Sequence, residues 1–231
     1  MHCSSDSQNM DCESHHTSAC SGRKQLEFLG HHLTEHGLTP LPEKVSAMKL
    51  YPRPRNAKEL RRYLGMINFY RRFVPHAAAT LAPLYDVLTR HNKLLKTAPL
   101  QWSEHENAGF DKSKQDLASA ALLAYPALDA DVYLAMDASD SAVSAVLQQR
   151  MPDGSMQPLG FFSRCLNEGQ SKWSVFGREL LTVFLAVRHF RHYLEGTEFT
   201  ILTDHQALIS AASNGKVRDI PRETRASAVP V

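Results

Sequence analysis

The stretch FGRELLTVFLAVRHFRHYLEGTEFTILTD, residues 176–204, decides the fold because it joins one strong helix to the strand that follows it. Apolar residues recur at helical spacing in its first part and predict a helix over about residues 174–194. Basic residues gather in the last turns and Gly196 comes after them, which is typical of a helix end. Residues 199–203 then predict a β-strand.

Three further strands are predicted before this helix. Apolar or alternating residues cover 132–136, 142–148 and 157–163, and Pro152-Asp153-Gly154 predicts a turn between the last two. The predicted order is βββαβ. An antiparallel hairpin sheet that continues through a right-handed helical crossover has this order, so we expect an α/β (α+β) fold with a mixed sheet.

The first half of the chain has the pattern of a small helical module. Residues 26–41 are interrupted by Gly and Pro and predict extended or turn structure. Asn56 and Ser103 are expected to cap the two longest helices. The predicted helices cover residues 43–50, 56–73, 78–89 and 103–121.

Charge divides the chain unevenly. Residues 41–76 carry nine basic and two acidic side chains, a net charge of +7, whereas the remainder carries 17 basic and 22 acidic ones, a net charge of −5. A surface that binds a polyanion, next to an acidic site that binds cations, has this distribution. A solvated helix surface explains the basic half equally well.

Three acidic side chains stand beside apolar segments of the second half. Asp137 closes the first strand in YLAMDAS, Asp204 closes the last strand in FTILTDH, and Glu179 borders the apolar stripe of the helix. Such carboxylates are costly to desolvate without a cation or hydrogen-bond donors. If the crossover places the two strands side by side, both aspartates leave the same edge of the sheet.

Acids that converge at close range repel one another unless divalent cations neutralise them. Mg²⁺ prefers oxygen ligands, and two metal ions about 3.5–4 Å apart would activate a water and stabilise the leaving oxygen of a phosphodiester. Taken singly, each acid is more often a capping or turn residue, so a structural role for each stays open.

The chain contains motifs that identify a family. FLGHHLTEHGLTPLPEKV (28–45), ELRRYLGMINFYRRFVP (59–75) and APLYDVLTR (82–90) resemble the thumb region of gypsy-type LTR retrotransposon Pol polyproteins. The ribonuclease H domain that follows the thumb there is similar to AMDASDSAVSAVLQQ, FFSRCL, FGRELLTVFLAVRHFRHYLEG and FTILTDHQAL. The resemblance runs in order from about Leu26 to Leu208.

This resemblance implies an RNase H-like fold and Mg²⁺-dependent cleavage of RNA in RNA–DNA hybrids, with Mn²⁺ as a possible substitute. Asp137, Glu179 and Asp204 stand where the family keeps its first three metal-binding acids. The basic helix would contact the phosphates of the hybrid backbone through its arginines. Recognition of the hybrid would rest on its shape and its 2′-hydroxyls, without reading the bases. These residues are Arg61, Arg62, Arg71 and Arg72.

The resemblance also implies a division of the chain. We expect a disordered leader over residues 1–24, a helical region like the thumb or connection of reverse transcriptase over 25–125, a truncated RNase H-like domain over 126–208 and an unrelated tail over 209–231. No Tyr-x-Asp-Asp occurs, so we expect no DNA synthesis by this chain alone. A separate polymerase chain is a possible partner.

Departures from the family pattern leave the activity open. The fourth metal-binding Asp of the family is not found, and Asp219 and Glu223 lie in the unrelated tail, so cleavage is expected to be impaired. Ser144 stands where the family usually has Gly. The alternative is a nucleic-acid-binding retroelement remnant that does not cut. A different hydrolase or a kinase on a similar sheet is disfavoured, because only Gly154 and Gly160 occur near the first hairpin, where a phosphate-binding enzyme of that kind would need Gly-rich loops.

Other classes are disfavoured by composition. No apolar run approaches the roughly 20 residues of a membrane helix, and the N-terminus lacks a signal-peptide pattern, so we expect an intracellular protein whose compartment is open. The four cysteines, Cys3, Cys12, Cys20 and Cys165, form neither a disulfide framework nor a zinc-ligand spacing.

Overall fold

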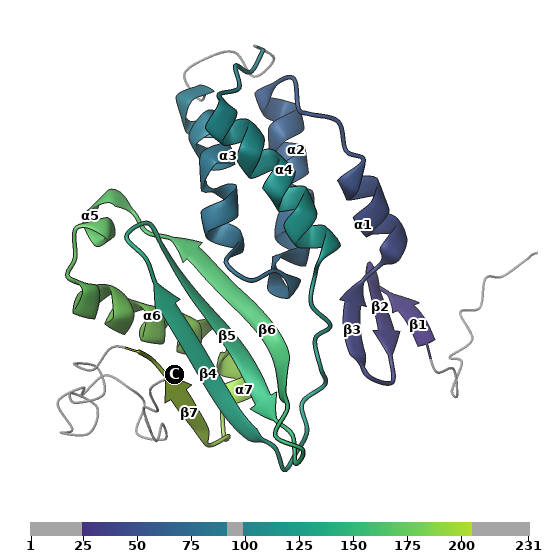
Figure 1. The fold of residues 1–231 in the computed structure, drawn as a ribbon, viewed down its shortest axis with the longest axis vertical. Helices are drawn as coiled ribbons and strands as arrows, with labels where there is room; N and C mark the ends of the chain where they lie inside the picture. The colour runs from purple at the N-terminus through teal and green to yellow at the C-terminus, as the bar shows by residue number, and fades with distance from the viewer. Residues whose placement is uncertain (1–24, 92–98, 205–231) are drawn as a thin grey trace, which may run out of the picture.

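The computed structural model describes residues 25–91 and 99–204. A helical unit lies against a four-stranded sheet, and a small three-stranded sheet lies beside the helical unit (Figure 1). The predicted leader over 1–24 and the tail over 209–231 lie outside the described residues.

The small sheet contains β1 (Gln25–Phe28), β2 (His31–Thr34) and β3 (Gly37–Pro40), which pair antiparallel in that order. Backbone hydrogen bonds join Leu38 to Leu123 in both directions, at 2.7 and 2.9 Å. Gly37 is required beside this bridge, because a Cβ there would collide with the Leu123 carbonyl oxygen. The small sheet is thereby tied to the segment that leads into the second half of the chain.

The helical unit consists of α1 (Pro42–Lys49), α2 (Ala57–Tyr70), the 3₁₀ turn η1 (Arg71–Phe73), α3 (Ala77–His91) and α4 (Glu104–Ala118). Both expected N-caps are confirmed: the Asn56 side chain accepts from the Glu59 N–H, and Ser103 forms a capping box with Glu106. The unit has its own apolar core. Its fully buried members include Leu60, Tyr63, Phe73, Leu84 and Phe110.

The larger sheet has the strand order β6-β5-β4-β7. Its strands are β4 (Asp131–Ala138), β5 (Ala142–Arg150), β6 (Met156–Cys165) and β7 (Phe199–Leu202). The first three pair antiparallel, whereas β7 runs parallel to β4. The predicted βββαβ order and mixed sheet are thus confirmed.

The connection between β6 and β7 contains α5 (Glu168–Ser171), α6 (Val175–His189) and α7 (Arg191–Leu194). The prediction of one helix over 174–194 is wrong, because α6 ends at His189 and Phe190 has ψ 13°. Phe190 is buried and its ring covers Gly160 of β6, where an added Cβ would approach that ring to 3.2 Å. This packing of Phe190 against the sheet coincides with the break between α6 and α7, and the apolar periodicity of the sequence does not predict it.

The helical unit docks on the sheet through η1 and the start of α3. The Ala78 N–H donates to the Ser163 Oγ of β6 at 3.0 Å, and the Arg71 guanidinium donates to the Ser163 carbonyl. The Ala124 N–H donates to the Pro158 carbonyl at 2.8 Å. These contacts fix the helical unit against the edge strand β6. Within the described residues, no helix is both long and apolar enough to cross a membrane.

Candidate functional site

The parallel pairing of β4 with β7 sets the positions of two predicted aspartates. Ala135 of β4 lies opposite Leu202 of β7. Asp137 and Asp204 each follow that pair by two residues, so both lie at the same end of the sheet. We call the C-terminal ends of β4 and β7 the acidic end of the sheet. The Asp137 side chain is 68% exposed there.

The third predicted acid, Glu179, lies on α6 and is buried, with 4% of the residue exposed. Its neighbour Arg178 shows which end of the sheet this part of α6 meets. The Arg178 Nη1 donates to the Ser139 carbonyl at 3.2 Å and pairs with Asp140 in the turn after β4. The early turns of α6 therefore meet the acidic end.

Arg178 is a site residue that the sequence did not single out. Only 8% of its side chain is exposed, whereas Asp140 is 95% exposed. Arg178 joins the start of α6 to the β4–β5 turn, and it thereby helps to set the position of Glu179 along the sheet relative to Asp137. An arginine beside an acid in a helix has no distinctive local pattern, so only the tertiary contact reveals this role.

The three acids form a donor set of carboxylate oxygens, which suits a hard cation such as Mg²⁺. Across residues 25–91 and 99–204, however, no three His, Cys, Asp or Glu side chains form a group that could hold a metal ion. The backbone thus brings the three acids to one end of the sheet, but their carboxylates do not converge on one cation site. Cys3, Cys12 and Cys20 lie outside the described residues, and Cys165 is half-buried.

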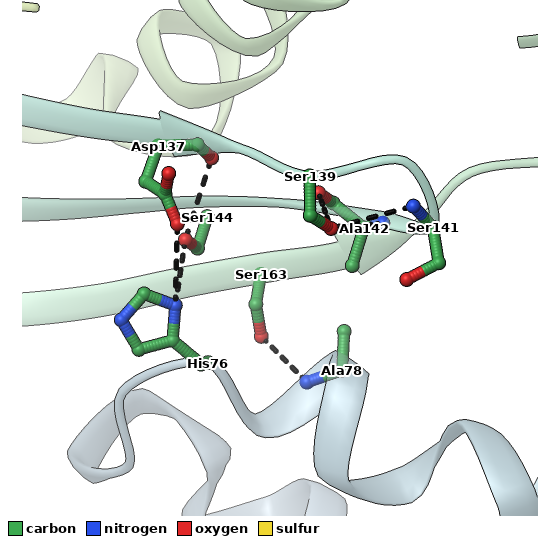
Figure 2. Close-up of polar contacts among 8 residues, drawn as sticks. All are labelled: His76, Ala78, Asp137, Ser139, Ser141, Ala142, Ser144 and Ser163. Carbon is green, nitrogen blue, oxygen red and sulfur yellow. Dashed lines mark hydrogen bonds and ion pairs between the residues drawn. The ribbon is translucent and has the colours of Figure 1, made fainter. Parts of the chain in front are cut away.

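A second residue missed by the sequence reaches the acidic end from the helical unit. The His76 Nδ1 lies 2.9 Å from the Ser144 Oγ and 3.9 Å from the Asp137 Oδ2 (Figure 2). Ser144 lies directly opposite Asp137 in the β4–β5 pair, and its hydroxyl donates to the Asp137 carbonyl at 3.4 Å. The helical unit therefore contributes directly to the surroundings of Asp137.

The four arginines predicted to contact nucleic acid fall into two sets. Arg61 and Arg62 lie on the exposed face of α2. Arg71 and Arg72 are half-buried at the junction with the sheet, where Arg72 donates to the Tyr193 hydroxyl at 3.4 Å. In the described part of the chain, neither Arg71 nor Arg72 pairs with a carboxylate.

Positive charge accumulates at that junction. The His189 ring lies 4.8 Å from the Phe162 ring, and its pKa is lowered by burial and by the nearby charges of Arg71, His192 and Arg72. Arg71 and Arg72 thus bring two positive charges close to the His189 ring at the junction.

Comparison with known proteins agrees with this architecture. Residues 102–201 match the family described as the RNase H-like domain found in reverse transcriptase. The Tf2-3 and Tf2-4 transposon polyproteins of Schizosaccharomyces pombe are each 35% identical over 194 residues, which is 83% of this chain. The chain spans 14% of the length of these polyproteins.

Solved structures with a similar fold include two of the foamy viral protease-reverse transcriptase. The complex with dsDNA has a TM-score of 0.75 and 17% identity, covering 90% of this chain and 45% of the other. The complex with an RNA/DNA hybrid has a TM-score of 0.68 and 18% identity, covering 86% and 26%. By sequence and fold, the chain belongs with the gypsy-type LTR retrotransposon polyproteins and carries their RNase H-like domain.

Proposed function

We propose that the chain binds RNA–DNA hybrids and cleaves their RNA strand with Mg²⁺, or with Mn²⁺ in its place. Asp137, Glu179 and Asp204 are the proposed metal-binding acids. The observation that carries the proposal is the β4–β7 register, which brings both aspartates to the end of the sheet that the start of α6 also meets. Residues 25–125 and 126–208 are the proposed thumb-like and nuclease regions.

Each acid has a distinct part in this proposal. Asp137 is exposed and would be accessible to a duplex, whereas Glu179 is buried on α6 and would supply a carboxylate from inside the fold. Asp204 follows the end of β7 and would supply the third carboxylate. A bound divalent ion would activate a water and stabilise the leaving oxygen. The chain would contribute the carboxylates that hold the ion, at the acidic end of the sheet.

The proposed nucleic-acid surface rests on charge. Arg61 and Arg62 present two exposed guanidinium groups on α2, and Arg71 and Arg72 add two without carboxylate partners in the described part of the chain. Contacts of this kind bind phosphate irrespective of base sequence and weaken as salt rises. The similar foamy viral structures are complexes with dsDNA and with an RNA/DNA hybrid, which supports a duplex as the partner.

A second candidate function is binding without cleavage. The observation that favours it is the lack, among the described residues, of a gathered group of acids ready to hold a metal ion. In that case the arginines would still retain nucleic acid, and Asp137 would not matter for binding.

A labelled RNA–DNA hybrid distinguishes the two functions. Incubation with Mg²⁺ or Mn²⁺ should yield RNA fragments, and Asp137→Asn should abolish them while leaving hybrid affinity intact. Asp131→Asn is the matched control, because Asp131 lies at the other end of β4, where its exposed pair with Arg150 contributes little to stability. Binding without fragments would support the second function, and a chain that neither binds nor cuts at low salt would refute both.

A further inference from the structure

His76 belongs to the helical unit but lies at the acidic end of the sheet. It stands in the turn between η1 and α3, and its Nδ1 is 2.9 Å from the Ser144 Oγ. The same nitrogen is 3.9 Å from the Asp137 Oδ2, as Figure 2 shows. The imidazole therefore faces both the hydroxyl beside Asp137 and the Asp137 carboxylate.

The backbone holds His76 in an unusual conformation. Its φ is +50°, in the left-handed region that residues with a side chain seldom adopt. Contacts on its C-terminal side fix it there: the Ala79 N–H donates to the His76 carbonyl at 3.0 Å, and the Ala78 N–H donates to Ser163 of the sheet. A strained conformation persists where the surroundings over-determine it, and such residues cluster at functional sites.

The direction of the His76–Ser144 hydrogen bond depends on the His76 tautomer. The Ser144 hydroxyl also lies 3.4 Å from the Asp137 carbonyl, to which it can donate. In the tautomer that carries the proton on Nδ1, the Ser144 Oγ accepts from the Nδ1–H, and that N–H also faces the Asp137 carboxylate. Ser144, His76 and Asp137 are not a nucleophile relay, because a relay uses both ring nitrogens and here one nitrogen faces both partners.

We propose that His76 is a positioning residue for Asp137. Through its Nδ1–H it restrains the Ser144 hydroxyl and the exposed Asp137 carboxylate, so that the helical unit orients an acid of the sheet. Because Ser144 contacts the backbone of β4, the restraint acts on that backbone as well as on the Asp137 side chain. The consequence for cleavage rests on the proposed nuclease function; the restraint itself does not.

Two substitutions of His76 separate the side chain from the backbone. His76→Gly keeps the positive φ without strain but removes the donor. His76→Asn also tolerates this φ, and its side-chain amide N–H replaces the Nδ1–H. A difference between His76→Gly and His76→Asn in the measurements below therefore reports the loss of the side-chain N–H donor. Melting temperatures equal to that of the wild type would show that neither substitution disturbs the fold.

The first measurement uses the metal-free protein with ¹³C-labelled aspartate. The side-chain carboxyl resonance of Asp137, assigned through Asp137→Asn, should shift in His76→Gly and stay near its wild-type position in His76→Asn. Ser144→Ala should reduce the effect of His76→Gly, because the two side chains act together. An Asp137 resonance that is the same in wild type, His76→Gly and His76→Asn would overturn the proposal.

The second measurement is hybrid cleavage. His76→Gly should lower kcat by about 10–100-fold, the usual effect of removing a partner of a metal-binding residue, without weakening hybrid binding. His76→Asn should restore most of the lost rate. Equal kcat values for wild type and His76→Gly would refute the catalytic role. If the wild-type chain does not cut, the nuclease proposal fails, and the carboxyl resonance still decides whether His76 restrains Asp137.

Discussion

Ser163→Ala tests the docking of the helical unit on the sheet. The Ser163 hydroxyl accepts from the Ala78 N–H, which lies in the first turn of α3 and has no partner within its own helix. Ser163 is 3% exposed, so water cannot replace the lost bond. A buried amide without a partner costs about 1–3 kcal/mol, and loss of a helix cap costs about 0.5–2 kcal/mol.

We therefore expect Ser163→Ala to lower the free energy of unfolding by about 1–2 kcal/mol, where the two ranges overlap. For a chain of this length, each kcal/mol lowers Tm by about 2–4 °C. Denaturant unfolding should show a lower midpoint with an unchanged slope, because the surface exposed on unfolding stays the same.

Ser141→Ala is the matched control for this substitution. Ser141 lies in the β4–β5 turn, is exposed, and its hydroxyl makes no hydrogen bond to the described residues (Figure 2). Its substitution should change the free energy of unfolding by less than about 0.5 kcal/mol. Equal stabilities for Ser163→Ala and Ser141→Ala would refute the inference that Ser163 caps α3 across the junction.

Three further variants, one of them a double substitution, test other parts of the structure. Arg61→Gln with Arg62→Gln should flatten the salt dependence of hybrid binding measured by fluorescence anisotropy; an unchanged slope would remove both from the surface. Tyr63→Phe should lower the free energy of unfolding by about 1 kcal/mol, because it removes the buried 2.6 Å bond to Ser113; an unchanged denaturation midpoint would contradict this. His31 has a pKa held below 6.5 by burial and by Arg72, so its contribution to stability falls as the pH drops below 6.5 toward its folded pKa. His31→Phe should therefore lessen the loss of Tm between about pH 8 and about pH 5, and an equal loss would exclude His31 as a source.

Local spacing predicted much of the fold because many signals act within one turn of chain. The Asn56 cap and the Ser103 capping box depend on residues three positions away, which a sequence displays directly. Apolar patterning predicts the strands of the larger sheet and, with them, the strand ends that carry Asp137 and Asp204. The sequence therefore places the two acids at strand ends, and the structure adds the register that brings them together.

Contacts between distant segments were not predictable in this way. The break at Phe190 accompanies packing on Gly160, thirty residues earlier, whereas the apolar period of the helix runs on without interruption. The bond of His76 to Ser144 likewise joins positions 68 residues apart. No local sequence pattern predicts that a side chain of the helical unit contacts the larger sheet.

The proposed metal site is tested most directly by anomalous diffraction from crystals of the chain grown with Mn²⁺. We expect a peak at the acidic end of the sheet, with carboxylate oxygens of Asp137, Glu179 and Asp204 as ligands at about 2.1 Å. A peak ligated by other residues, or none at saturating Mn²⁺, would contradict the claim that these three acids share a divalent ion.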